Sequence, residues 1–130
     1  MAKKVVDKTG ILCYTLITVR DITGKERKMT MLEMLKALQN NDGLTLRNGK
    51  PITYKTGYQV ADYGTECHTA EEALAAINNM GGNCGIWLSD GIFYVDHSFR
   101  ITTKREALQI GRKYSQISIL RWADMSLIYC

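Results

Sequence analysis

The stretch GIFYVDHSFRITTKREAL, residues 91–108, decides the fold, because a related stretch, GYQVADYGTECHTAEEAL, stands at residues 57–74. Six of the 18 aligned positions are identical, far more than chance pairing gives: Gly57/Gly91, Asp62/Asp96, Thr69/Thr103, Glu72/Glu106, Ala73/Ala107 and Leu74/Leu108. A repeat in the sequence usually repeats a structural unit. We predict an internal repeat of residues 57–90 and 91–122, with a third, weaker unit in residues 1–56.

Each stretch has the pattern of a strand followed by a helix with a marked start. Thr69 and Thr103 are each followed three residues later by Glu, as is Thr30, and this spacing is the capping-box pattern. We expect three helices that begin alike, the first of them over residues 31–39. The apolar positions after each Thr recur on one helical face, which predicts helices packed on a sheet. These positions are Leu35 and Leu38, Leu74 and Ile77, and Leu108 and Ile110.

Two turn signals place hairpins around these helices. Asn48-Gly49 and Asp90-Gly91 suit two-residue type I′ turns, which need positive φ at both central positions. Pro51 is expected on a sheet edge, because proline cannot donate to a ladder. The strands that flank the turns are expected at residues 44–46 and 52–54, and at 86–88 and 92–95. Further strands are expected at residues 11–19, 117–120 and 127–129.

From residue 57 onward the expected order is strand, helix, strand, strand, helix, strand, which is the split βαβ arrangement of ferredoxin-like folds. No linker or low-complexity tract interrupts the chain. The sequence therefore predicts an α+β fold: a mostly antiparallel sheet with about three helices packed on it, in a single domain of residues 1–130.

Charge is unevenly distributed along the chain. Residues 1–50 hold ten Lys/Arg and five Asp/Glu, residues 51–98 hold one and six, and residues 99–130 hold six and two. Such polarity can steer association with an oppositely charged partner, and it is equally compatible with an ordinary solvated surface. A pure nucleic-acid binder is more often basic throughout.

The four cysteines, Cys13, Cys67, Cys84 and Cys130, form no C-x-x-C pair. No secretion signal or apolar run of membrane-spanning length accompanies them. We expect reduced thiols in a cytosol and no membrane association. Two histidines and scattered cysteines do not make a metal site, and no cofactor motif is present, so we expect neither metal nor cofactor.

The strand expected around residues 92–101 separates two faces, because successive side chains of a strand point to opposite sides. Tyr94, Asp96, Ser98 and Arg100 alternate on the polar face, where they are candidates for binding a ligand or a partner. The alternative is the solvated side of an antiparallel sheet. His97 falls on the apolar face, where a hydrogen-bonded core histidine is more common than a catalytic one.

A basic strip is predicted on the helix that follows this strand. Lys104, Arg105, Arg112 and Lys113 recur at helical spacing. They suit phosphate groups, which they would bind in a salt-sensitive and sequence-tolerant way. The alternative is the solvated face of an amphipathic helix.

A thiol enzyme is the main catalytic alternative, because thiolate chemistry needs only a base within reach. Cys84 with His97, or Cys67 with His68, would supply such a pair. Neither pair stands in a recognisable signature, and no phosphate loop, metalloprotease motif or serine elbow is present. We therefore expect no enzymatic activity and assign no catalytic residue.

The runs GIFYVD (91–96), TKREALQIGR (103–112) and QISI (116–119), together with Ser98, resemble small proteins of phages and prophages. They are also similar to modules within the large polyvalent proteins of mobile elements. The resemblance implies a mobile-element accessory protein that disables host defence, and it carries over no catalytic residue. Residues 1–56 share in no such likeness.

From this resemblance and the polarised charge we expect a non-enzymatic phage or mobile-element protein that binds and inhibits a bacterial defence complex, of anti-CRISPR type. Its partner would be a host protein or a ribonucleoprotein complex in the bacterial cytosol. The chain itself would be a monomer or a homodimer. The alternatives are a nucleic-acid-binding accessory protein, a small thiol enzyme, and a protein that sequesters nucleotides.

Overall fold

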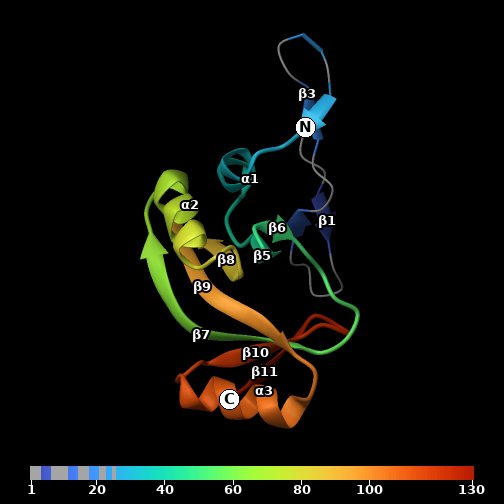
Figure 1. Ribbon diagram of the computed structural model, residues 1–130, viewed down its shortest axis with the longest axis vertical. Coiled ribbons are helices and arrows are strands. Elements are labelled where there is room, and N and C mark those ends of the chain that lie inside the picture. The colour runs from blue at the N-terminus through green and yellow to red at the C-terminus, as the bar shows by residue number, and fades with distance from the viewer. Residues whose placement is uncertain (1–3, 7–11, 15–17, 21–22, 25) are drawn as a thin grey trace.

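The computed structural model describes residues 4–6, 12–14, 18–20, 23–24 and 26–130. Within them the protein is an α+β fold with three helices, α1 (Met31–Ala37), α2 (Ala70–Asn79) and α3 (Lys104–Lys113). The long strands at the centre bend, and α2 and α3 lie toward opposite ends of them (Figure 1). The predicted fold class is confirmed.

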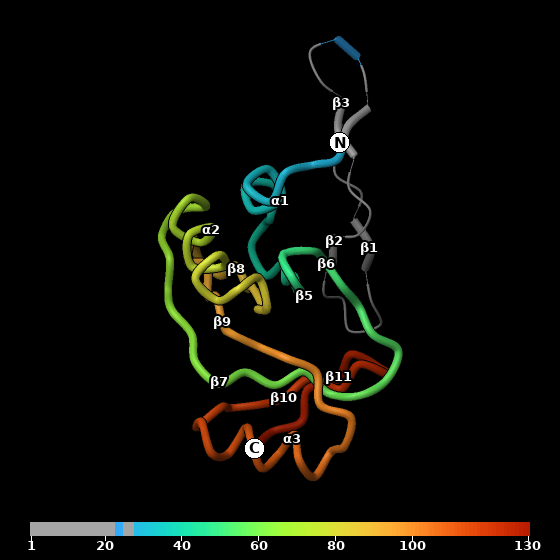
Figure 2. The backbone as a smooth tube through the Cα atoms, viewed as in Figure 1, coloured from blue at the N-terminus to red at the C-terminus, as the bar shows by residue number. Residues whose placement is uncertain are grey.

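A seven-stranded antiparallel sheet forms the centre of the molecule, in the order β11-β10-β7-β9-β8-β5-β6. Two separate two-stranded ladders join β1 to β2 and β3 to β4. The path of the chain from β7 through α2 to β8 and β9 can be followed in Figure 2. The strands of the large sheet are β5 (Gly43–Arg47), β6 (Lys50–Pro51), β7 (Tyr58–Cys67), β8 (Cys84–Ser89), β9 (Ile92–Ile101), β10 (Ser118–Arg121) and β11 (Ser126–Tyr129). The ladders are formed by β1 (Lys4–Val6) with β2 (Leu12–Tyr14) and by β3 (Thr18–Arg20) with β4 (Glu26–Lys28).

Two strand, helix, strand units interleave in the large sheet. The first is β7, α2 and β8, and the second is β9, α3 and β10. Strand β9 lies between the two strands of the first unit, and β7 lies between the two strands of the second. This interleaving is the split βαβ arrangement predicted for the C-terminal part of the chain.

A β-bulge at Asp62 keeps both ends of β7 facing the helices. Ala61 pairs with Ser98 and Tyr63 pairs with His97, so Asp62 is the extra residue. Strict alternation would place Val60 and Cys67 on opposite faces, since they are an odd number of residues apart. The extra residue reverses that parity, and both side chains are buried against helices.

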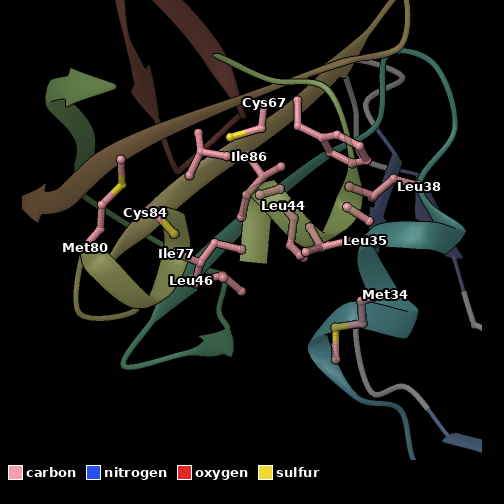
Figure 3. Close-up of a cluster of buried hydrophobic side chains, with 14 residues drawn as sticks. Met34, Leu35, Leu38, Leu44, Leu46, Cys67, Ile77, Met80, Cys84 and Ile86 are labelled. Carbon is pink, nitrogen blue, oxygen red and sulfur yellow. The ribbon is translucent and has the colours of Figure 1, made fainter. Parts of the chain in front are cut away.

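The larger buried cluster lies between the sheet and helices α1 and α2 (Figure 3). It combines the apolar faces of both helices with alternate residues of β5, β8 and β9. A smaller cluster under α3 consists of Val60, Ala107 and Ile119, with partly buried neighbours such as Ile101 and Ile128. All of these residues lie on the face of the sheet that the helices cover, so the alternate residues of the same strands point away from the helices.

The three helices begin at the predicted threonines, yet only α1 has a complete capping box. Thr30 accepts from the Glu33 N–H at 3.2 Å, and Glu33 accepts from the Thr30 N–H at 3.2 Å. Thr69 and Thr103 cap α2 and α3 in the same way, accepting from backbone N–H groups at 3.1 Å and 3.4 Å. At α2 the expected return bond is replaced, because the Glu72 carboxylate accepts instead from the His68 N–H at 2.8 Å.

Both predicted hairpin turns are present. Asn48 and Gly49 have φ of 51° and 77°, and Asp90 and Gly91 have φ of 50° and 78°, as a type I′ turn requires. Pro51 lies on the edge strand β6, as predicted. The second strand of the first hairpin was expected at residues 52–54 and instead spans Lys50–Pro51, because the turn sets the pairing of Arg47 with Lys50.

Two other expectations differ in extent from the structure. Helix α1 ends at Ala37 rather than at residue 39, because Leu38 is extended with ψ of 139°. The strand expected at residues 11–19 lies partly outside the described residues. Strand β2 falls within its range, and β3 begins in it and extends to Arg20.

Candidate functional site

The face of the sheet that points away from the helices carries the polar residues predicted on β9. We call it the outer face, and it contains Gln59, Ala61, Gly85, Trp87, Tyr94, Asp96, Ser98 and Arg100. Their register places Tyr94 beside Trp87, Asp96 beside Gly85, Ser98 beside Ala61, and Arg100 beside Gln59. The structure therefore brings Tyr94, Asp96, Ser98 and Arg100 into one row, as the alternation of the strand predicted.

A hollow of about 310 Å³ lies at one end of the outer face, and we call it the basic hollow. Arg47 and Arg100 both line it, and neither is within ion-pair distance of a carboxylate among the residues that the structure describes. Segments far apart in the sequence form its walls: Leu46, Arg47, Ile52, Tyr54, Gln59, Asn83, Ser98, Phe99 and Arg100.

Arg100 is held rigidly at this hollow. Its Nε donates to the Thr56 carbonyl oxygen at 2.9 Å, and one Nη donates to the Thr56 Oγ1 at 3.0 Å. The guanidinium carbon lies 5.1 Å from the centre of the Tyr54 ring, within cation–π range. Gly57, with φ of 89°, leaves room for this arrangement, because a Cβ there would lie 2.7 Å from the Arg100 Nε. Arg100 is thus fixed before any ligand arrives.

A short chain of hydrogen bonds forms the wall beside Arg100. The Trp122 Nε1 donates to the Gln59 Oε1 at 3.2 Å, and the Gln59 Nε2 donates to the Ser98 Oγ at 3.0 Å. The Trp122 ring also meets the Tyr54 ring edge-on, with centres 5.5 Å apart. These bonds fix the orientation of the Gln59 amide, and they leave the Ser98 hydroxyl hydrogen to donate elsewhere.

A second hollow, of about 420 Å³, adjoins the first and shares Gln59 and Ser98 with it. Asp96 lies in it between two glycines, because its neighbours on β7 and β8 are Gly64 and Gly85. A side chain at Gly64 would collide with the Asp96 carboxylate. Burial raises the pKa of Asp96 above its ordinary value of 3.8. The outer face is therefore basic on one side of Ser98 and acidic on the other.

Replacing Asp96 with asparagine is expected to stabilise the protein at neutral pH. Within the described residues no cation or hydrogen-bond donor contacts the Asp96 carboxylate, so its ionised form is disfavoured by burial. A carboxyl group whose pKa is raised by folding contributes stability below its unfolded pKa and loses that contribution as pH rises through the folded pKa. Urea denaturation measures the difference in the free energy of unfolding between Asp96→Asn and the wild type. This difference should be largest at pH 7 and should disappear as pH falls toward 3.8. An equal difference at both ends of that range would contradict a raised pKa of Asp96.

The opposite end of the outer face is aromatic. Trp87 is 36% exposed, and its ring covers Gly43, where a Cβ would lie 3.1 Å from Trp87 Cε3. Tyr94 pairs with Trp87 across the β8–β9 ladder and with Glu66 across the β7–β9 ladder. Trp87 was not among the predicted binding residues. The two-residue turn at Asp90-Gly91 is the signal that could have placed it, because that turn pairs Trp87 with Tyr94 on the polar side of β9.

The predicted basic strip is a separate surface. Lys104, Arg105, Arg112 and Lys113 are all exposed on α3, while Ala107 and Gly111 of the same helix are buried. Helix α3 packs on Val60, which lies on the side of β7 opposite to Gln59. The eight predicted binding residues therefore divide between two faces of the sheet and do not form one site.

His97 lies on the helix-covered face, as predicted, and is only partly buried there. Its Nδ1 is 2.8 Å from the Asp62 Oδ1, and its ring stacks on Tyr63 with centres 5.1 Å apart. The bulge residue Asp62 thus supplies the hydrogen bond that a half-buried histidine requires.

The proposed thiol pairs are poorly suited to nucleophilic chemistry. Cys84 is the cross-strand neighbour of His97, but burial raises the pKa of the Cys84 thiol to about 12. Burial also raises the pKa of Cys67, and Glu72 adds to this effect. A thiol with a raised pKa stays protonated at neutral pH, and the thiolate is the reactive form.

The described residues contain no group of three or more His, Cys, Asp and Glu side chains arranged to hold a metal ion. No helix in the described part of the chain has the length and apolar character needed to cross a membrane. Comparisons with family models, with curated proteins and with solved structures gave no match.

Proposed function

We propose that this chain is a non-enzymatic binding protein of a phage or other mobile element. It inhibits a bacterial defence complex of the CRISPR type in the host cytosol, by covering a protein surface of that complex with its outer face. The observation that carries the proposal is the composition of this face, on which Trp87 and Tyr94 lie at one end and Arg100 and Arg47 at the other.

Trp, Tyr and Arg are the residues that contribute most to the energy of protein interfaces. They are also enriched in interface cores relative to the rest of the protein surface. The 36% exposure of the Trp87 side chain leaves part of a large apolar ring in contact with water, which a partner would exclude.

The charges on the outer face suggest the character of the partner surface. Arg47 and Arg100 form no ion pair with a carboxylate among the described residues. A bound protein that presents Asp or Glu there would form ion pairs with them. Asp96, at the neighbouring hollow, favours a donor or a cation on the partner. Complementary charges of this kind mainly increase the association rate and the specificity. The class of partner rests on the resemblance to phage and mobile-element proteins.

The test is a plasmid-interference assay in bacteria that carry defined CRISPR–Cas systems. Expression of the wild-type chain should restore transformation by a targeted plasmid in at least one system. The tagged chain should also retain that system's effector complex on purification. Trp87→Ala should weaken the purified complex by about 30-fold or more, as expected for truncation of an interface hot spot.

Tyr63→Ala is the matched control, because Tyr63 is a 54% exposed aromatic residue on the helix-covered face. Tyr63→Ala should restore transformation as the wild-type chain does, and it should retain the effector complex equally well. The proposal would be refuted if the wild-type chain restored transformation in no CRISPR–Cas system. It would also be refuted if folded Trp87→Ala and Tyr63→Ala variants lost binding to the effector complex equally.

Nucleic-acid binding through α3 is the second candidate. It is favoured by the four exposed basic side chains on this helix, none of which forms an ion pair within the described residues. Lys104→Ala combined with Arg112→Ala should then abolish retention on heparin and reduce the salt dependence of DNA binding. Unchanged retention of the double variant would exclude this role for α3.

A further inference from the structure

We propose that the basic hollow is a binding site for the phosphate monoester group of a small molecule. The inference concerns a different ligand from the protein partner of the preceding section, although both would use Arg47 and Arg100. It stands whether or not that partner is a defence complex. It rests on the two arginines, on how they are held, and on the size of the hollow.

The two guanidinium groups converge on one tyrosine. Arg100 lies over the Tyr54 ring, and the Arg47 Nη1 reaches the Tyr54 Oη at 3.5 Å, which is long for a hydrogen bond. Two positive charges that line one hollow repel each other when no anion is present. No carboxylate of the described residues neutralises them, so an anionic ligand would relieve that repulsion.

The available donors suit an oxyanion. Thr56 engages the Arg100 Nε and one Nη, so the other Nη has no hydrogen-bond partner within the described chain. Ser98 accepts from Gln59, and its own hydroxyl hydrogen therefore adds a second kind of donor at the same wall. Arg100 and Gln59 are already fixed by protein contacts, which lowers the entropy that binding would cost.

A phosphate monoester fits these donors better than a carboxylate or a phosphodiester does. It carries a charge near two and three terminal oxygens, whereas the other groups carry one charge. Arginine is the side chain best matched to such planar recognition of phosphate. The volume of about 310 Å³ falls at the lower end of the range for small-molecule sites, which is enough for a phosphate and part of the group that bears it.

The experiment measures binding of adenosine monophosphate by isothermal titration calorimetry at fixed ionic strength. Inorganic phosphate, sodium chloride and a single-stranded oligonucleotide without terminal phosphates are the parallel ligands. Saturable binding is expected for adenosine monophosphate, with weaker binding for phosphate and none for chloride. The oligonucleotide offers only diesters and should not compete.

Arg47→Gln should weaken adenosine monophosphate binding about tenfold or more, because a charge-assisted hydrogen bond is lost. Arg47 is exposed, so this variant is expected to fold, whereas Arg100→Gln also removes the bonds to Thr56. Arg112→Gln on α3 is the matched control and should bind as the wild type does. Trp87→Ala should also retain the nucleotide, which separates binding at the basic hollow from the contribution of the aromatic end of the outer face.

Three results would overturn the inference. The first is that adenosine monophosphate gives no more binding heat, and no more thermal stabilisation of the protein, than chloride does. The second is an equal loss in Arg47→Gln and Arg112→Gln, which would indicate a general charge effect. The third is oligonucleotide binding that depends on Arg47, which would make the hollow a nucleic-acid site.

Discussion

Gly82→Ala is expected to lower the free energy of unfolding by about 4 kcal/mol, the sum of a positive-φ penalty and steric overpacking. Gly82 is buried with φ of 77°. A Cβ there would collide with the Gly49 N and lie 2.8 Å from the Gly49 Cα and 2.9 Å from the Asn48 carbonyl carbon. These are backbone atoms, which cannot rotate out of the way as a side chain can.

The hairpin turn at Asn48 and Gly49 is also hydrogen-bonded to the loop that contains Gly82, so it cannot move aside without a further loss. The Gly49 N–H donates to the Gly82 carbonyl oxygen at 3.0 Å, and the Asn48 N–H donates to the Asn83 Oδ1 at 3.0 Å. Displacing the hairpin would break both bonds. It would also shift Asn83 and Arg47, which line the basic hollow, so nucleotide binding should fall together with stability.

Gly91→Ala is the matched control for this variant. Gly91 has nearly the same φ, 78°, and nothing lies within 4 Å of the position a Cβ would occupy. It should therefore show only the conformational cost, about 1 kcal/mol. Urea denaturation of both variants measures the difference, and equal losses would show that the contact with the hairpin is unimportant.

Leu35→Ala is expected to cost about 3 to 4 kcal/mol, within the range for large-to-small changes in a core. The Leu35 side chain is 0% exposed and belongs to the cluster that joins α1 to α2 and the sheet (Figure 3). Helix α1 has seven residues, too few to be stable without packing. The variant should therefore lose α1 as well as core contacts, with a fall in helical circular dichroism.

Leu127→Ala provides the comparison, because the Leu127 side chain is 53% exposed on the edge strand β11. This variant should lower the free energy of unfolding by no more than about 0.5 kcal/mol. Chemical denaturation at constant pH, followed by fluorescence, compares the two variants. A similar midpoint for Leu35→Ala and Leu127→Ala would mean that α1 contributes little to the fold.

Local chemistry made much of the fold predictable. Thr30, Thr69 and Thr103 mark helix starts because a Thr hydroxyl satisfies an N–H that the helix itself cannot. Asp90-Gly91 marks a hairpin because few residue pairs tolerate two positive φ angles. The outward row from Tyr94 to Arg100 follows from the alternation of a strand, which needs no tertiary information.

The basic hollow was beyond such inference. Arg47, Asn83 and Arg100 meet there although they belong to separate segments, and no local pattern specifies that meeting. The bulge at Asp62 was also unpredicted, and it determines that Val60 and Cys67 face the same way. A bulge arises from how two strands pair, so neither strand reveals it alone.

The amino-acid sequence alone determined the order of strands and helices, the turns, and which side of β9 is polar, because neighbours along the chain control these features. Tertiary packing determined how the surfaces of distant elements are placed. It set the basic strip of α3 on the opposite side from the polar row, and it joined Arg47 and Arg100 around Tyr54. Contacts between distant segments depend on how all the strands register in one sheet, and that register is a property of the assembled chain.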